Sequence, residues 1–162
     1  MVATYKLHTY WKLFISIFIC EVIGISSAII SNTNNSIWFD TIKKPTWNPP
    51  AYLFGPVWTI LYLLMGIALW IVWEAEINYA KKINAISLFF LQLFFNFCWS
   101  ILFFKYHFIG LALLDILILL TSIATTMFAF ATIDKKAILL LIPYIAWVSF
   151  ATILNFTIWI MN

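Results

Sequence analysis

The sequence predicts an all-α integral membrane protein that folds as a bundle of five transmembrane helices. Hydrophobic residues make up 65% of its 162 positions and charged residues only 9%, against about 25% charged residues in soluble domains. So few charges cannot cover a surface that faces water. A bilayer is crossed by about 20 mostly apolar residues in helical form, and five runs meet this requirement. They lie at residues 13–30, 51–73, 83–104, 108–131 and 137–161.

The connections between these runs are short, except for residues 31–50. Backbone groups in lipid must form their hydrogen bonds within the protein, and the runs are too long for barrel strands, so we expect helices. Short connections place sequential helices side by side and antiparallel. We therefore expect one transmembrane domain over residues 1–162, without a separate soluble module.

The first run, 13–30, shares some features with a secretory signal peptide. Lys6 and Lys12 precede it, and small residues at 26–28 lie near its end. Glu21 interrupts the apolar core, however, and the run continues beyond the small residues. We therefore favour its retention as a transmembrane helix.

The connection 31–50 leads into the second run through the stretch KKPTWNPPAYLFGPVW, residues 43–58. A residue that precedes proline is kept out of helical conformation, so the prolines at 45, 49 and 50 should hold residues 44–50 extended or turned. Pro56 comes slightly late for a first helical turn, and we expect a distorted or hinged turn around 54–56. The connection is thus predicted to be a stiff cap over one end of the bundle. Its aromatic residues are Trp38, Phe39 and Trp47.

The later four runs each carry polar or aromatic side chains at helical spacing. We therefore expect each of these helices to present a face that combines polar groups with large aromatic rings. In the second run the face consists of Phe54, Trp58, Tyr62 and Met65, and in the third of Phe89, Gln92, Asn96, Trp99 and Ser100. In the fourth run it consists of Asp115, Ser122 and Thr126, and in the fifth of Pro143, Trp147, Ala151 and Asn155.

Polar side chains within a membrane are costly unless they face the bundle interior. We therefore expect Gln92, Asn96, Asp115 and Asn155 to point inward. Two interpretations follow: hydrogen bonds between helices, at about 0.6 kcal/mol each, or an aromatic ligand pocket with few polar groups.

Interhelical hydrogen bonding is the favoured interpretation for Gln92 and Asn155. The pocket is favoured for Asn96 and for the indoles, because hydrogen bonding between helices does not require an indole ring. These indoles are Trp58, Trp99 and Trp147. For Trp47, packing at headgroup depth and ligand contact are equally supported.

The sequence shows no hydrolytic triad, nucleotide-binding loop or set of metal ligands, and its scattered lysines form no stripe for nucleic acid. Cys20 and Cys98 lie inside apolar runs and are interpreted as small hydrophobic residues. Glu21 and Asp115 could form a proton relay, although a structural hydrogen bond or a cap is the favoured interpretation for both.

Four blocks carry a resemblance to a known family, and with their spacing they cover nearly the whole chain. They read KKPTWNPPAYLFGPVWTILYLLMGIALWIVW (43–73), QLFFNFCWSILFF (92–104), LALLDILIL (111–119) and LIPYIAWVSFATILN (141–155). On these blocks the sequence resembles the translocator protein family, also called tryptophan-rich sensory proteins or the peripheral-type benzodiazepine receptor family, in its bacterial form.

The resemblance implies five transmembrane helices, often in a homodimer, with a pocket between the helices under the long first loop. Family members bind porphyrins, haem-related tetrapyrroles, sterols and synthetic isoquinoline or benzodiazepine ligands. Carried over to this sequence, the pocket wall comprises Trp58, Asn96, Trp99, Trp147, Ala151 and Leu154, the upper rim Pro49, Phe54 and Tyr62, and the lid contacts Phe39 and Trp47.

Two features depart from the family pattern. The sterol-recognition pattern of animal members ends in tyrosine and arginine, whereas this chain has Phe156 at the tyrosine position and no basic residue after it. The family's small-residue motifs for dimerisation also have no clear match in 83–104. Sterol binding and a homodimer are therefore less supported than the pocket itself.

The resemblance implies a membrane receptor or sensor for tetrapyrroles such as protoporphyrin IX, or for other hydrophobic molecules, with translocation of the ligand as an extension. One alternative is light-dependent porphyrin degradation, with Trp58 and Trp147 as redox-active indoles. Another is a transporter of porphyrin or sterol. No cofactor is required, and porphyrin or haem would be a ligand; nucleic acid is not an expected partner.

The composition favours a bacterial cytoplasmic membrane, because isoleucine, lysine and asparagine replace valine and arginine as in AT-rich genomes. The positive-inside rule favours a cytoplasmic amino terminus. On that side lie Lys6, Lys12, Lys81, Lys82, Lys135 and Lys136, and on the other Lys43, Lys44 and Lys105.

Overall fold

The computed structural model describes residues 2–33 and 36–162, and it confirms the all-α membrane fold. Five helices of the described chain are long and apolar enough to cross a membrane. The helices are α1 (Val2–Ser31), α2 (Ile37–Thr41), α3 (Ala51–Glu74), α4 (Tyr79–Ser100), the π-helix η2 (Ile101–Lys105), α5 (Ile109–Ala131) and α6 (Lys135–Met161). The membrane-spanning part of α1 is Tyr10–Ser31, and α4 and η2 together form the span Tyr79–Lys105.

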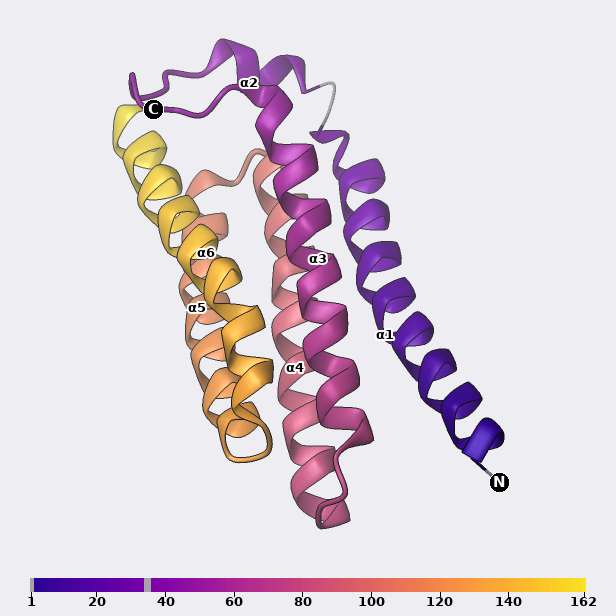
Figure 1. The fold of residues 1–162 in the computed structure, drawn as a ribbon. Coiled ribbons are helices and arrows are strands. Elements are labelled where there is room, and N and C mark those ends of the chain that lie inside the picture. The colour runs from indigo at the N-terminus through magenta and orange to yellow at the C-terminus, as the bar shows by residue number, and fades with distance from the viewer. Residues whose placement is uncertain (1, 34–35) are drawn as a thin grey trace.

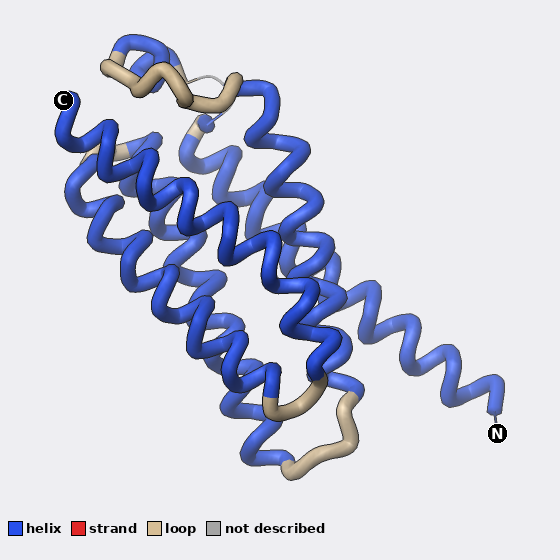
Figure 2. Tube along the Cα trace, turned by 60° about the vertical axis from the view of Figure 1, so that its left-hand side comes forward, coloured by secondary structure: helices blue, strands red, loops and turns tan. Residues whose placement is uncertain are grey.

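The spanning helices form a closed arrangement. α3 packs between α1 and α6, α5 packs between α4 and α6, and α1 also contacts α4 and η2. Figures 1 and 2 show the helices running along one common direction, with α2 and the rest of the long connection at the end where the chain terminus of α6 lies. The short connections at the other end are capped locally: the Asn78 side chain accepts hydrogen bonds from two backbone N–H groups, and Asp134 accepts one from Lys136.

Two helix boundaries differ from the prediction. α1 begins at Val2 rather than near residue 13. Lys12, directly before the predicted start, pairs with Glu74 of α3 at 2.7 Å. The third span does not stay α-helical to its end, since it changes to a π-helix after Ser100. This change follows the residues Trp99 and Ser100, which face the cavity described below.

The hinge expected around residues 54–56 does not break α3, which is continuous from Ala51 to Glu74 with Pro56 inside it. The hydrogen bond that Pro56 cannot donate would go to the carbonyl of Tyr52, in the first turn of the helix. The loss therefore falls at the helix end. The prolines before α3 act as predicted, since residues 43–50 form no helix and contain a turn at 46–47.

Glycines allow α1 and α3 to approach each other closely. A Cβ atom on Gly66 of α3 would lie 2.6 Å from the Cα atom of Ile17 in α1, and one on Gly24 of α1 would fall on the ring of Tyr62 in α3. Side chains at either position would therefore force the two helices apart.

Candidate functional site

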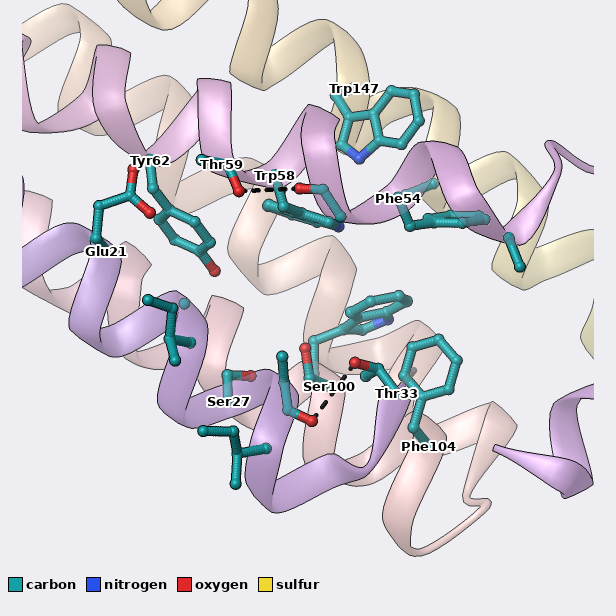
Figure 3. A pocket seen from close by; sticks show the side chains of 18 of the residues that line it. Glu21, Ser27, Thr33, Phe54, Trp58, Thr59, Tyr62, Ser100, Phe104 and Trp147 are labelled. Carbon is teal, nitrogen blue, oxygen red and sulfur yellow. Dashed lines mark hydrogen bonds between the residues drawn. The ribbon is translucent and has the colours of Figure 1, made fainter. Parts of the chain in front are cut away.

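A cavity of about 490 Å³ lies between the helices beneath α2. Its wall is formed by α1, by the first three turns of α3, by Trp99 and Ser100 at the end of α4, by η2 and by α6, and α2 contributes Phe39. Figure 3 shows the two sides of this space: Phe54, Trp58 and Trp147 lie along one side, and Ser27, Ser100 and Thr33 lie across from them.

The aromatic side of the cavity is held by contacts between rings. Trp58 stacks on Tyr62 with the ring centroids 5.6 Å apart and meets the edge of Tyr144 at 6.3 Å. Phe54 meets Trp147 of α6 in an edge-to-face arrangement at 6.0 Å. These contacts fix the orientation of the rings, so the wall is already formed before a ligand arrives.

The connection over the cavity is anchored to the bundle at several points, as the cap interpretation predicts. Phe39 of α2 packs against Phe104 of η2 at 5.5 Å, and Trp38 stacks on His107 at 4.2 Å. Lys44 donates a hydrogen bond of 2.6 Å to the carbonyl of Phe39 and lies 4.5 Å from the centre of its ring. We call the connection formed by residues 36–50 the lid. Phe39, the lid residue that lines the cavity, is therefore held by Phe104 and by Lys44.

Asn162, at the end of α6, anchors the part of the lid that contains Lys43. The Asn162 side chain accepts a hydrogen bond from the backbone N–H of Lys43 and donates one to the carbonyl of the same residue, both at 3.0 Å. The lid is thus tied to the end of α6.

A buried network of hydrogen bonds lies next to the cavity floor. Tyr62 donates to the Asn96 side-chain oxygen, Asn96 donates to the Tyr144 hydroxyl at 3.3 Å, and Tyr144 donates to Gln92 at 2.7 Å. The network joins α3, α4 and α6 through polar groups that are all buried. Because Tyr62 also lines the cavity, its ring position is fixed by this network.

A second link joins α4 to α6 and α5. The Trp99 indole N–H donates to the Asn155 side-chain oxygen at 3.0 Å, and the Asn155 amide donates to the carbonyl of Ile109 at 3.0 Å. Hydrogen bonding between helices, the favoured interpretation for Gln92 and Asn155, is confirmed. Trp99 combines both roles, since its ring also lines the cavity.

The expected inward orientation of the polar residues is confirmed. The exposed fraction is 1% for Gln92, 2% for Asn96, 8% for Asp115 and 1% for Asn155. Asn96 corrects the pocket interpretation, because its side chain is enclosed in the Tyr62–Tyr144 network and lies outside the cavity lining.

The structure brings together most residues of the predicted site. Those in the cavity wall are Phe39, Phe54, Trp58, Tyr62, Trp99, Trp147 and Ala151. Those outside the wall are Trp47, Pro49, Asn96 and Leu154. Trp47 packs edge-on against Phe150 of α6 at 5.8 Å and keeps 45% of its surface exposed, while Leu154 is buried in the core.

The contribution of α1 to the cavity was missed at the sequence level. Glu21, Gly24, Ser27 and Ala28 all belong to the wall. A signal was present, since small residues recur at helical spacing along α1, at positions 16, 20, 24, 27 and 31, and this pattern marks a face that packs closely on a neighbouring helix.

No group of three or more potential metal-binding side chains occurs within the part of the chain that the structure describes. Asp115 is buried on α5, whereas Glu21 lies in the cavity wall on α1. Both cysteines are free. The chemistry that the cavity offers is therefore that of aromatic rings, hydroxyl groups and one carboxyl group.

Comparison with known proteins identifies the family. The model of the TspO/MBR family matches residues 16–160. The chain is 42% identical to the tryptophan-rich protein TspO of Chlorobaculum tepidum, over 89% of this chain and 91% of that protein. It is 36% identical to the human translocator protein, over 75% of this chain and 73% of that protein. It is 33% identical to the tryptophan-rich sensory protein of Cereibacter sphaeroides, over 90% of this chain and 89% of that protein. The chain is therefore an integral membrane protein of the TspO/MBR family.

Proposed function

We propose that this protein is a membrane receptor that binds a flat hydrophobic molecule, a tetrapyrrole such as protoporphyrin IX, in the cavity beneath α2. The observation that carries the proposal is the set of aromatic rings from three helices, Trp58, Trp99 and Trp147, around one cavity of about 490 Å³. Small-molecule sites have volumes of about 300–1,000 Å³ and are mostly apolar with a few polar groups. The names of the relatives, a sensory protein and a translocator protein, agree with a receptor for a small molecule.

The indole of Trp58 is the ring best placed to stack on such a ligand. It lines the cavity and is held by Tyr62 on one side and by Tyr144 on another. Aromatic contacts contribute about 0.5–1.5 kcal/mol beyond the burial of apolar surface, and burial of a large side chain contributes about 1.5–3 kcal/mol. Together these contributions come to about 2–4.5 kcal/mol, so loss of this ring should weaken binding by about thirtyfold or more.

The test is a titration with protoporphyrin IX in the dark, with quenching of tryptophan fluorescence as the readout, on the wild type, Trp58→Ala and Trp11→Ala. Trp11 is the matched control, because it is 61% exposed and lies outside the cavity lining. We expect saturable quenching in the wild type and in Trp11→Ala, and a much higher Kd in Trp58→Ala. Equal affinity in all three would rule out this cavity as the binding site.

Light-dependent breakdown of a bound porphyrin is the second candidate. It is supported by the position of Trp58 and Trp147 in the same cavity wall, where both indoles would lie against an excited macrocycle. The double variant Trp58→Phe/Trp147→Phe retains an aromatic wall and should keep dark binding. If the indoles take part in the chemistry, illumination will yield a new product with the wild type and none with the double variant. The same product from both would reject the role of these indoles.

A further inference from the structure

We infer that the cavity selects its ligand by charge: the end of the ligand that enters deepest carries an ammonium or N–H donor, which the Glu21 carboxylate accepts. The inference rests on the proposed function, because it concerns the same cavity. Glu21 lies in the middle of the α1 span Tyr10–Ser31, roughly 16 Å from either end at about 1.5 Å per residue. A carboxyl group at this depth is costly unless it meets a partner.

Glu21 faces the cavity rather than the lipid. It is part of the cavity wall, and Figure 3 shows its carboxylate beside the Tyr62 ring, at the end of the cavity farthest from Phe54 and Phe104. Gly24 and Tyr62 close this end, since the Tyr62 ring packs directly on the α1 backbone where Gly24 leaves room. The carboxyl group therefore sits at the closed end of the space that a ligand would fill.

Two polar side chains near Glu21, those of Tyr62 and Lys12, are already engaged elsewhere. The Tyr62 hydroxyl donates to Asn96. Lys12 of the same helix pairs with Glu74 and lies roughly 13 Å from Glu21 along the helix axis. Among the described side chains, no hydrogen bond or ion pair reaches the Glu21 carboxylate. Its partner must then come from the contents of the cavity.

A second unsatisfied group lies on the same wall. Ser27 of α1 is 2% exposed, lines the cavity, and its hydroxyl has no hydrogen-bond partner in the described structure. Buried polar groups are nearly always hydrogen-bonded. A ligand that presents donor groups along one edge, and an apolar face toward Trp58 and Trp147, would satisfy both Glu21 and Ser27.

The charges at the two ends of the cavity give the ligand a direction. Glu21 lies beside Tyr62 at one end of the cavity, whereas Lys43 and Lys44 lie in the connection between α2 and α3, where Lys44 donates to the carbonyl of the lining residue Phe39. A carboxylate at the inserted end would be repelled by Glu21, because like charges in a low-dielectric site oppose each other strongly. A tetrapyrrole with acidic side chains would therefore bind with those side chains toward the lid. The N–H groups of protoporphyrin IX lie at the centre of its ring, so a flat ligand with an amine on its outer edge matches Glu21 better than protoporphyrin does.

The test compares three probes of one shape with the full chain in phosphatidylcholine nanodiscs: 9-aminomethylanthracene, 9-hydroxymethylanthracene and 9-anthracenecarboxylate. Energy transfer from tryptophan to anthracene reports binding, and empty nanodiscs correct for partition into lipid. The variant is Glu21→Gln, which keeps the shape of the side chain and removes its charge. The matched control is Glu76→Gln, an exposed residue in the connection between α3 and α4.

We expect the wild type and Glu76→Gln to bind the amine about tenfold more tightly than the alcohol, and the carboxylate most weakly, as for a desolvated charge pair. In Glu21→Gln the three affinities should converge to within about threefold. The inference is overturned if the wild type shows no preference for the amine, if Glu21→Gln keeps the preference, or if none of the three probes binds.

The protoporphyrin titration separates this failure from failure of the proposed function. If protoporphyrin binding depends on Trp58 while Glu21→Gln leaves the probe preference intact, only the charge selection is wrong. If protoporphyrin binding does not depend on Trp58, the receptor proposal fails as well.

Discussion

Replacement of Gly24 by alanine should disturb the floor of the cavity and the contact between α1 and α3. The added Cβ atom would lie 2.8 Å from the Cζ atom of Tyr62 and closer still to two other carbons of the ring. Measured from the closest ring carbon, the ring would have to retreat by about 1.3 Å or more to restore ordinary contact distances of about 3.5–4.0 Å. Tyr62 is 6% exposed and hydrogen-bonded to Asn96, so it has little room to move.

The expected loss of stability follows from three contributions. Insertion of an extra carbon into a packed interface costs about 1–3 kcal/mol. Loss of the hydrogen bond from Tyr62 to Asn96 costs about 0.5–1.5 kcal/mol. The higher helix propensity of alanine offsets about 1 kcal/mol. The free energy of unfolding should therefore fall by about 2 kcal/mol.

The assay is equilibrium unfolding in mixed detergent micelles, followed by tryptophan fluorescence and circular dichroism. The matched control is Gly55→Ala in α3, where an added Cβ atom would meet nothing within 4 Å; there the same substitution should be neutral or stabilise by about 0.5–1 kcal/mol. If Gly24→Ala is as stable as Gly55→Ala, the close packing of Tyr62 on α1 is refuted.

Two further predictions concern the end of the bundle and the lid. Asn155→Leu removes the acceptor of the Trp99 indole N–H and leaves that donor buried, so the free energy of unfolding should fall by about 1–3 kcal/mol; an unchanged midpoint in the same unfolding assay would contradict this. Lys44→Met removes the hydrogen bond and the cation–π contact to Phe39, which should weaken protoporphyrin binding by about threefold to tenfold. Lys43→Met is the control, because the contacts of Lys43 to Asn162 use only its backbone, and equal affinities in the two lysine variants would show that the lid does not depend on the Lys44 side chain.

The five spanning helices could be predicted because the bilayer leaves few choices: apolar runs of this length must be helical, and polar side chains must turn inward. Asp115 shows this, since it is buried on α5 despite its charge. The cap over the bundle could be predicted as well, because proline restricts the local backbone whatever its neighbours are. The spanning helices follow from the lipid bilayer around them, and the cap follows from its own local sequence.

The partners of inward-facing groups could not be predicted in the same way. Its helix face favours Asn96 for the pocket, yet its side chain lies in the network with Tyr62 and Tyr144. Which of two inward positions reaches a cavity depends on the relative heights and rotations of three helices. Trp47 is a similar case, since its contact with Phe150 depends on the path of the lid across α6.

The role of α1 was also hidden at the sequence level. Its apolar run resembles any other span, and Glu21 stands out only as a charge in a membrane segment. Its position at the closed end of the cavity depends on how α1 approaches α3, which is set by Gly24 and Gly66. The sequence feature that indicates the contact of α1 with α3 is the spacing of its small residues, not Glu21.

The most direct test of the receptor proposal is protection of one cavity position by the ligand. Ala151 lines the cavity, whereas Ala146 lies outside it on the exposed surface of the same helix. Each would be replaced by cysteine in a background in which Cys20 and Cys98 are changed to alanine, and the rate of labelling by a small maleimide would be measured with and without protoporphyrin IX in the dark. Protoporphyrin should slow labelling of the Ala151→Cys variant by about tenfold or more and leave Ala146→Cys unchanged, as expected for a ligand that fills the site. Equal labelling rates with and without protoporphyrin at both positions would contradict the receptor proposal.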